Sequence, residues 1–459
     1  MNKNAFPSFS KKTKIGLHYF PDTLHYRDAD LQTWLPRLKS LGVSWLALRA
    51  PVDRAIPESF IRTLAQEKID PILQFNVNLG DPPAVEEMQV MLEAYSHWGV
   101  QHVLFFERPN SQRSWASPEW AQTRLVERFL DQFLPLAKSA LQTGLTPLLP
   151  PLEPGGGYWD TTFFRALLES LIRREEKELL NNLVIGAYAW TWGRPLNWGA
   201  GGPERWPDAR PYNISPDIQD QRGFRTLDWY QAVARALLGK SLPVMLFEAG
   251  VQHDPLSSQG KAISPAADQS ILAIARLLEG EELNDPADPA SRLEPLPEEI
   301  IACNFWLLSA DTYSSFQNQA WFQQDGSHIP LVEKWIQWVK ETLSQKTAGH
   351  LNQPAVNKAS FSPATLPDSH HPIAHYMLLP LYEWGVADWH LEVIHPFVKK
   401  YQPTVGFSLQ EAALAAHVTV VGNEQTFPES AIERLRIGGA IVERISGSGT
   451  SIASQLSER

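Results

Sequence analysis

Short apolar runs alternate eight times with stretches of helical periodicity between residues 15 and 343, and this alternation restricts the fold to few possibilities. We expect strands at 15–20, 43–49, 69–77, 100–106, 145–149, 183–190, 242–248 and 300–308. We expect the intervening helices at 29–41, 60–67, 85–98, 125–143, 162–180, 227–238, 269–278 and 331–343. Eight strands alternating with eight helices predict a (β/α)8 TIM barrel.

The chain has 459 residues, which is too long for one compact core. We assign residues 1–345 to the barrel. Residues 346–371 are rich in Ala, Ser, Pro, Asn and His without periodicity, which is typical of a linker. Residues 372–459 contain further strand-like runs and short helical segments, so we expect a small C-terminal α/β domain.

Charge and composition exclude several classes of protein. A net charge of -11 argues against nucleic acid as a partner. No run approaches the roughly 18 apolar residues that span a bilayer, and the N-terminus lacks an apolar signal core. We therefore expect a cytoplasmic protein, with export by an unrecognised route left open. Cys303 is the single cysteine, and His18, His25 and His253 lack ligand spacing, so we expect neither metal nor cofactor.

Two glutamates follow apolar runs in the same way, 141 positions apart. Glu248 ends the seventh predicted strand and Glu107 follows the fourth. An ionisable group at the mouth of a buried strand is costly unless it is paired or functional. Glycosidic bonds are cleaved by two carboxyl groups that flank the anomeric carbon. We therefore predict Glu248 and Glu107 as a catalytic pair that acts on a carbohydrate.

Other strand-end residues are candidates for binding that carbohydrate. Asn76 closes the third predicted strand, His18 lies in the first, and Trp190 closes the sixth. Indole faces suit the apolar faces of sugar rings. We expect these three side chains to contact the substrate, although packing within the core is the simpler explanation for most of the 17 tryptophans.

With Glu107 after strand four and Glu248 at the end of strand seven, residues 15–343 resemble the clan A glycoside hydrolases, which are retaining (β/α)8 enzymes. The resemblance implies that Glu248 is the nucleophile and Glu107 the acid/base. It also implies that Arg49 and Tyr188 support the nucleophile and that Trp306 floors the sugar subsite.

The sequence around Glu107 departs from that family. It reads Phe106-Glu107-Arg108-Pro109-Asn110, where the family has Asn-Glu-Pro-Asn. An inward Arg108 would lower the pKa of Glu107 and oppose its role as an acid. The chain is therefore either a variant glycosidase or a non-catalytic carbohydrate- or cell-wall-binding protein on the same barrel. A barrel enzyme of another chemistry, such as a lyase, is a third alternative.

The C-terminal segment carries a second resemblance. Val418-Thr419-Val420-Val421-Gly422, then 427–435, then Val442 to Gly447 with its Arg-Ile-Ser-Gly ending, resemble half of a type 2 cell-wall-binding repeat. The resemblance implies contact with a cell-wall polymer. A small domain that docks on the barrel or makes oligomer contacts is the alternative.

Overall fold

The computed structural model describes two compact units, Met1–His350 and Leu351–Arg459. In the first unit it describes residues 13–209, 220–252, 265–286 and 291–350. In the second it describes residues 351, 373–380, 394, 397–398, 400–401, 403–424, 426–447, 451–452 and 455–456. Each unit is described below by itself. His253, one of the candidate histidines, lies outside these residues.

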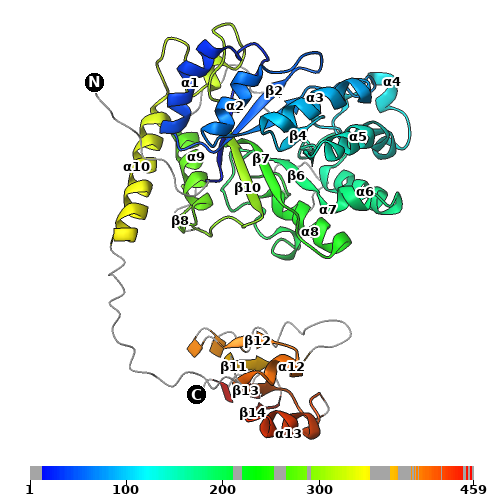
Figure 1. Ribbon diagram of the computed structural model, residues 1–459, viewed down its shortest axis with the longest axis vertical. Helices are drawn as coiled ribbons and strands as arrows, with labels where there is room; N and C mark the ends of the chain where they lie inside the picture. The colour runs from blue at the N-terminus through cyan, green and yellow to red at the C-terminus, as the bar shows by residue number, and fades with distance from the viewer. Residues whose placement is uncertain are drawn as a thin grey trace. The chain divides into compact units, whose positions relative to one another are not determined.

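Eight parallel strands of the first unit close into a barrel in the order β1-β10-β7-β6-β5-β4-β3-β2 (Figure 1). They are β1 (Ile15–His18), β2 (Trp45–Ala50), β3 (Asp70–Phe75), β4 (His102–Leu104), β5 (Thr146–Leu149), β6 (Val184–Tyr188), β7 (Val244–Ala249) and β10 (Ile300–Phe305). Each lies within or close to the span expected for it, so the predicted TIM barrel is confirmed.

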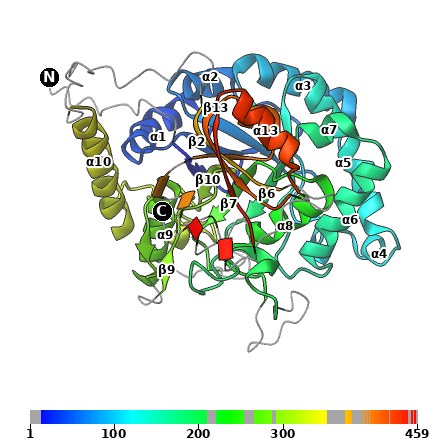
Figure 2. The same ribbon diagram turned by 90° about the horizontal axis from the view of Figure 1, so that it is seen from below.

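Helices form a ring around these strands (Figure 2). They are α1 (Asp28–Ser40), α2 (Glu58–Gln66), α3 (Val85–Trp98), α5 (Leu125–Gln142), α6 (Asp160–Arg173), α8 (Thr226–Leu238), α9 (Pro265–Leu278) and α10 (Pro330–Leu351). Shorter elements lie in the connections: α4 (Ser117–Trp120), α7 (Lys177–Asn181) and the two-stranded pair β8 (Leu283–Asn284) and β9 (Arg292–Leu293).

Two expected boundaries differ from the structure. The helix expected at 162–180 is two helices, because Glu175 between α6 and α7 adopts a left-handed φ of 56° that ends the first helix. The last barrel helix, α10, continues to Leu351 and so includes residues that we assigned to the linker. The rest of that linker, 352–371, lies outside the described residues.

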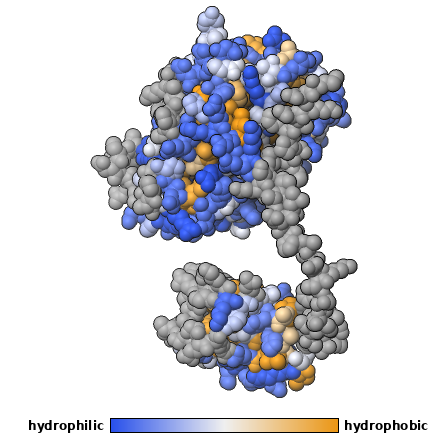
Figure 3. Space-filling model, turned by 90° about the vertical axis from the view of Figure 1, so that its left-hand side faces the viewer, coloured by the Kyte–Doolittle hydropathy of each residue, from blue (hydrophilic) through white to orange (hydrophobic). Residues whose placement is uncertain are grey.

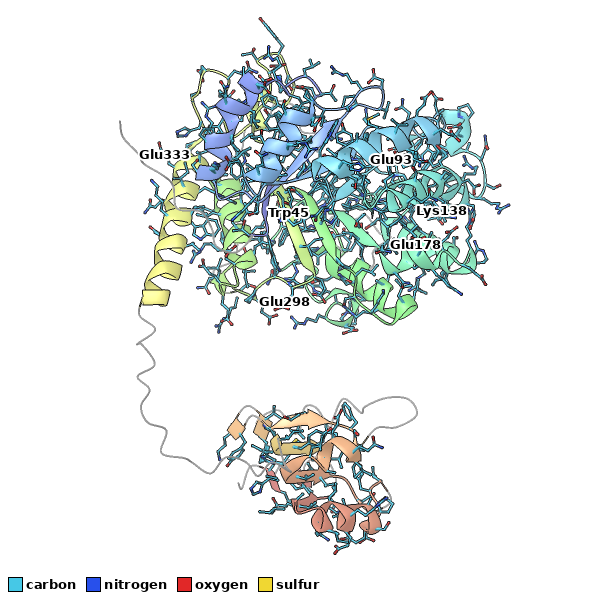
Figure 4. All side chains as sticks on the ribbon, in the orientation of Figure 1. Trp45, Glu93, Lys138, Glu178, Glu298 and Glu333 are labelled. Atoms are coloured by element: carbon cyan, nitrogen blue, oxygen red, sulfur yellow. The ribbon has the colours of Figure 1, made fainter. Side chains whose placement is uncertain are left out.

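Strand alternation separates two cores in the barrel. Along β2, Trp45 and Ala47 belong to a cluster inside the barrel, whereas Leu46 and Leu48 belong to the larger core beneath the helices. Trp45 lies among the strands in Figure 4, while the labelled Glu93, Lys138 and Glu178 lie on the outer helical layer. Because successive strand side chains point to opposite faces, a strand covered on both faces must be apolar throughout.

The second unit has a parallel sheet of four strands in the order β12-β11-β13-β14. Its elements are β11 (Ile373–Leu378), β12 (Thr404–Gly406), α12 (Leu409–Ala412), β13 (Ala415–Val421), α13 (Glu429–Ile437) and β14 (Ile441–Ile445). Tyr376 and Leu378 pack in one apolar cluster, and Met377 and Leu379 in another, so both faces of β11 are covered. The predicted small α/β domain is confirmed.

The visible exterior is mainly hydrophilic, with scattered apolar side chains (Figure 3). Within the described residues, no helix has the length and apolar character needed to cross a membrane.

Candidate active site

A cleft of about 700 Å³ lies where the barrel strands end at their carboxyl termini. It is lined by Pro21, Asp22, Thr23, Leu24, Arg49, Asn76, Val77, Asn78, Leu79, Glu107, Arg108, Ser111, Arg113, Ser114, Glu153, Glu248, Trp306 and Phe316. The side chains that a TIM barrel presents at this end come from several different strands. Both predicted glutamates are among them.

A bulge in β7 places Glu248. Leu246 pairs with Cys303 and Ala249 with Phe305, so β7 has one more residue than β10 over this stretch. Glu248 adopts a left-handed φ of 52° within it. Strict alternation from Phe247, which points into the barrel, would turn Glu248 toward the helices. The extra residue re-aims the side chain so that it faces the cleft.

Groups from three other strand ends hold Glu248. Its backbone N–H donates to His18 Nε2 at 3.0 Å, and Trp190 Nε1 donates to its Oε2 at 2.8 Å. Arg108 Nη2 lies 3.7 Å from the same oxygen. Burial raises the pKa of Glu248 to about 7, and the charge of Glu107 adds to the rise, while Arg108 and Arg49 oppose it.

Glu107 pairs with a different arginine. Arg49, in β2, donates from Nη1 to Glu107 Oε1 at 2.8 Å, and both side chains are about one-fifth exposed to the cleft. The family resemblance implied that Arg49 supports Glu248. In the structure its hydrogen bond goes to Glu107, whereas the carboxylate of Glu248 accepts a hydrogen bond from Trp190.

Arg108 is buried among aromatic rings. Its guanidinium carbon lies 5.0 Å from the ring centre of Tyr188 and 5.2 Å from that of Trp190, and these two rings stack on each other. Arg108 Nε donates to the Tyr188 hydroxyl at 3.0 Å. The inward arginine thus lies against Glu248 and Tyr188. Tyr188, which the resemblance assigned to the nucleophile, receives Arg108 instead.

The eight predicted site residues divide into two layers. Glu107, Glu248, Arg49, Asn76 and Trp306 are among the described residues that line the cleft. The other three, His18, Tyr188 and Trp190, are at most 2% exposed and lie behind that lining. His18 and Trp190 hydrogen-bond to Glu248, and Tyr188 accepts a hydrogen bond from Arg108.

The buried ring of His18 is neutral and accepts a hydrogen bond. Its Nε2 accepts the Glu248 N–H, so this nitrogen carries no proton. Burial, with Arg49 nearby, holds the pKa of His18 well below its usual range, so the ring stays neutral. Trp306 packs edge-on against it, at 5.0 Å between ring centres, and this contact links His18 to the cleft lining.

Sequence reasoning missed Glu153 and Arg113, which also line the cleft. Glu153 lies in the connection between β5 and α6, where no periodic pattern marked it. Phe106, which stands before Glu107 where the similar family has Asn, is 1% exposed and packs against Phe129 of α5. In the segment after β4, the first residue that lines the cleft is therefore Glu107.

A second polar cluster lies beside the cleft. Ligand-type atoms of Asp22, His25 and Asp311 lie within 4.8 Å of one another. His25 Nε2 is 3.1 Å from Asp311 Oδ1, so these side chains connect the loop after β1 to the loop after β10.

Comparison with known proteins gives a likeness of fold alone. No protein-family model matches the chain, and no curated protein matches it. Among solved structures, a β-xylosidase from Caulobacter crescentus CB15 is 12% identical over 72% of this chain and 69% of its own, with a TM-score of 0.45. A family 51 α-L-arabinofuranosidase from Bifidobacterium longum is 12% identical, covering 73% and 75%, with a TM-score of 0.40.

Sugar isomerases are found in the same search. A D-psicose 3-epimerase from Clostridium cellulolyticum H10 is 11% identical over 72% of this chain and 97% of its own, with a TM-score of 0.38. Likenesses at this level extend to glycoside hydrolases and epimerases alike. They carry no argument for one activity over another, so the function has to be argued from the site.

Proposed function

We propose that this protein hydrolyses a glycosidic bond, with Glu248 and Glu107 as its two catalytic carboxyl groups. The observation that carries the proposal is that both carboxyl groups line one cleft at the carboxyl-terminal end of a TIM barrel. Each is held by a guanidinium group, Arg49 for Glu107 and Arg108 for Glu248. Trp306 provides an aromatic surface in the same cleft.

The alternative is a carbohydrate-binding protein without turnover. A Glu107 turned away from the cleft and locked against Arg108 would favour that alternative. Glu107 instead lines the cleft and accepts a hydrogen bond from Arg49. Arg108 donates to Tyr188 and lies beside Glu248. This arrangement supports an enzyme, because both carboxyl groups belong to the lining of one cleft.

Hydrolysis of a panel of aryl glycosides and polysaccharides by the wild type and Glu248→Gln tests the proposal. We expect turnover by the wild type and a loss of roughly 10²–10⁴-fold or more in the variant, because an amide can neither attack nor transfer the proton. The near-isosteric change should preserve the fold. Absence of turnover in both proteins, with sugars still shifting tryptophan fluorescence, would instead indicate a binding protein.

The pH profile assigns the two roles. A nucleophilic Glu248 must be ionised, so kcat/KM should rise as the pH increases through about 7, the pKa that burial gives this carboxyl. Arg108→Met should move this rise to higher pH, because Arg108 lowers the pKa of Glu248. The opposite assignment makes Glu107, in its ion pair with Arg49, the nucleophile and Glu248 the acid. It predicts a fall in kcat/KM over the same pH range, because the acid must be protonated.

For the second unit we propose contact with a cell-wall polymer. The support is its sequence: the segments that resemble a type 2 repeat form the end of β13, then α13, then β14. Co-sedimentation of the full chain with purified cell-wall sacculi, compared with residues 1–351, tests this. Equal sedimentation of both proteins would rule out a contribution from the second unit.

A further inference from the structure

Glu153 has features that the catalytic pair does not explain. It lines the cleft from the connection between β5 and α6, and its side chain is 17% exposed. One carboxylate oxygen, Oε1, lies 3.8 Å from Arg113 Nη2. The other, Oε2, is buried and has no hydrogen-bond partner among the described residues. A buried carboxylate oxygen without a donor is costly, and a ligand that supplies the donor removes that cost.

The backbone of Glu153 is fixed on both sides. Asn110, which is fully buried, accepts the Glu153 N–H at 2.8 Å and donates to the Glu153 carbonyl at 2.9 Å. It also donates to the Tyr158 carbonyl at 2.9 Å. Glu153 therefore lies on a loop whose backbone is hydrogen-bonded to the segment that carries Glu107. Such preorganisation suits recognition at a fixed distance from the reacting groups.

The charges of the cleft indicate what kind of ligand it takes. Its lining contains three arginines, and each faces a carboxylate: Arg49 on Glu107, Arg108 near Glu248 and Arg113 near Glu153. Asp22 adds a fourth carboxylate. A carboxylated sugar would therefore meet, among the described lining residues, only guanidinium groups that already face an acid. Neutral hydroxyls can donate to carboxylates and accept from guanidinium or amide groups without adding charge.

We propose that Glu153 forms a further sugar subsite in this cleft, in which its carboxylate accepts hydrogen bonds from hydroxyl groups of a neutral oligosaccharide. This inference rests on the proposed function for its choice of sugar as ligand. Glu153 binds and orients a sugar unit beside the bond that Glu248 and Glu107 act on. It takes no part in bond cleavage.

The test measures binding and turnover separately. In the full chain carrying Glu248→Gln, calorimetry with neutral gluco-, xylo- and arabino-oligosaccharides is compared with oligogalacturonate. We expect a neutral oligosaccharide to bind best and Glu153→Ala to raise its Kd roughly 10–100-fold, the usual effect of losing a hydrogen bond to a charged group. Glu153→Gln, which keeps one acceptor, should lose less. Glu119 also has a buried oxygen for which the described residues offer no hydrogen-bond partner, but it lies outside the cleft lining, so Glu119→Ala should leave Kd unchanged.

Turnover by Glu153→Ala in the otherwise wild-type chain completes the test. A raised KM with kcat nearly unchanged, and an unchanged pH profile, supports a subsite. Tighter binding of oligogalacturonate, no binding of any oligosaccharide, or an unchanged Kd and KM in Glu153→Ala overturns the inference. Hydrolysis with an unaffected KM would leave the proposed function standing and remove the subsite. Binding that depends on Glu153, without hydrolysis, would keep the subsite and remove the proposed function.

Discussion

Glu248 shows how much support one buried carboxyl group needs. Its main chain is anchored on His18 from β1, and its side chain on Trp190 after β6, with Arg108 from the β4 loop close by. Both Arg108 and Glu248 have a φ of 52°, in the left-handed region that non-glycine residues rarely occupy. Backbone strain of this kind concentrates at functional sites, where surrounding packing enforces it.

A pH-dependent stability follows from this burial. The pKa of Glu248 is raised from 4.5 to about 7 in the folded state, so the native protein binds more protons than the unfolded chain between these values. The free energy of unfolding should therefore fall as the pH rises from about 4.5 through 7. Because one pKa unit corresponds to roughly 1.4 kcal/mol, the total fall is at most about 3 kcal/mol. Glu248→Gln removes this dependence.

Urea unfolding of the wild type and Glu248→Gln at pH 5 and pH 8 measures the effect. We expect the variant to be the more stable protein at pH 8, with the difference shrinking at pH 5. A difference that is the same at both values would show that the Glu248 carboxyl is ionised across the whole range.

Among the elements, the β4 and β5 connections depend on one buried amide. Asn110 makes three hydrogen bonds to the main chain of residues 153 and 158. It follows Glu107 by three positions, so the same short segment carries a catalytic candidate and the anchor of a neighbouring loop. The geometry of the cleft is thus shared between two connections that are separate in sequence.

Removal of this amide should loosen the cleft and the fold together. Asn110→Ala leaves buried backbone groups without partners, at a cost of roughly 1–3 kcal/mol for each group that water cannot reach. Asn110→Asp keeps the acceptor for the Glu153 N–H, but it buries a carboxylate oxygen against the Glu153 and Tyr158 carbonyl oxygens, so its loss of stability should be at least as large. Denaturant unfolding curves of both variants check this order. A fully stable Asn110→Ala protein would mean that the loop holds itself in place.

At the scale of the whole molecule, the two units have separate cores. The barrel core is formed by residues between Ile15 and Val339, and the clusters of the second unit by residues between Ile373 and Leu456. Every residue that lines the cleft lies between Pro21 and Phe316. We therefore predict that the proposed chemistry on a small substrate requires the first unit alone.

Truncation tests this independence. A chain of residues 1–351 should fold and should keep kcat/KM for a small aryl glycoside within about twofold of the full chain, because domains with their own core fold alone. A lower rate on an insoluble wall polymer only would agree with the proposed role of the second unit. Loss of activity on the small glycoside would show that residues beyond 351 contribute to the cleft.

The sequence by itself determined the barrel and the position of its two glutamates. Apolar periodicity is a local property, so it located the eight strands and their helices within a few residues, and parallel strands bring their carboxyl ends together. Only the tertiary structure decided which partner each long side chain takes. The β7 bulge turns Glu248 inward, His18 and Tyr188 are buried behind the cleft lining, and Arg49 and Arg108 lie beside different carboxylates. These choices depend on packing between segments far apart in the chain, which no local pattern encodes.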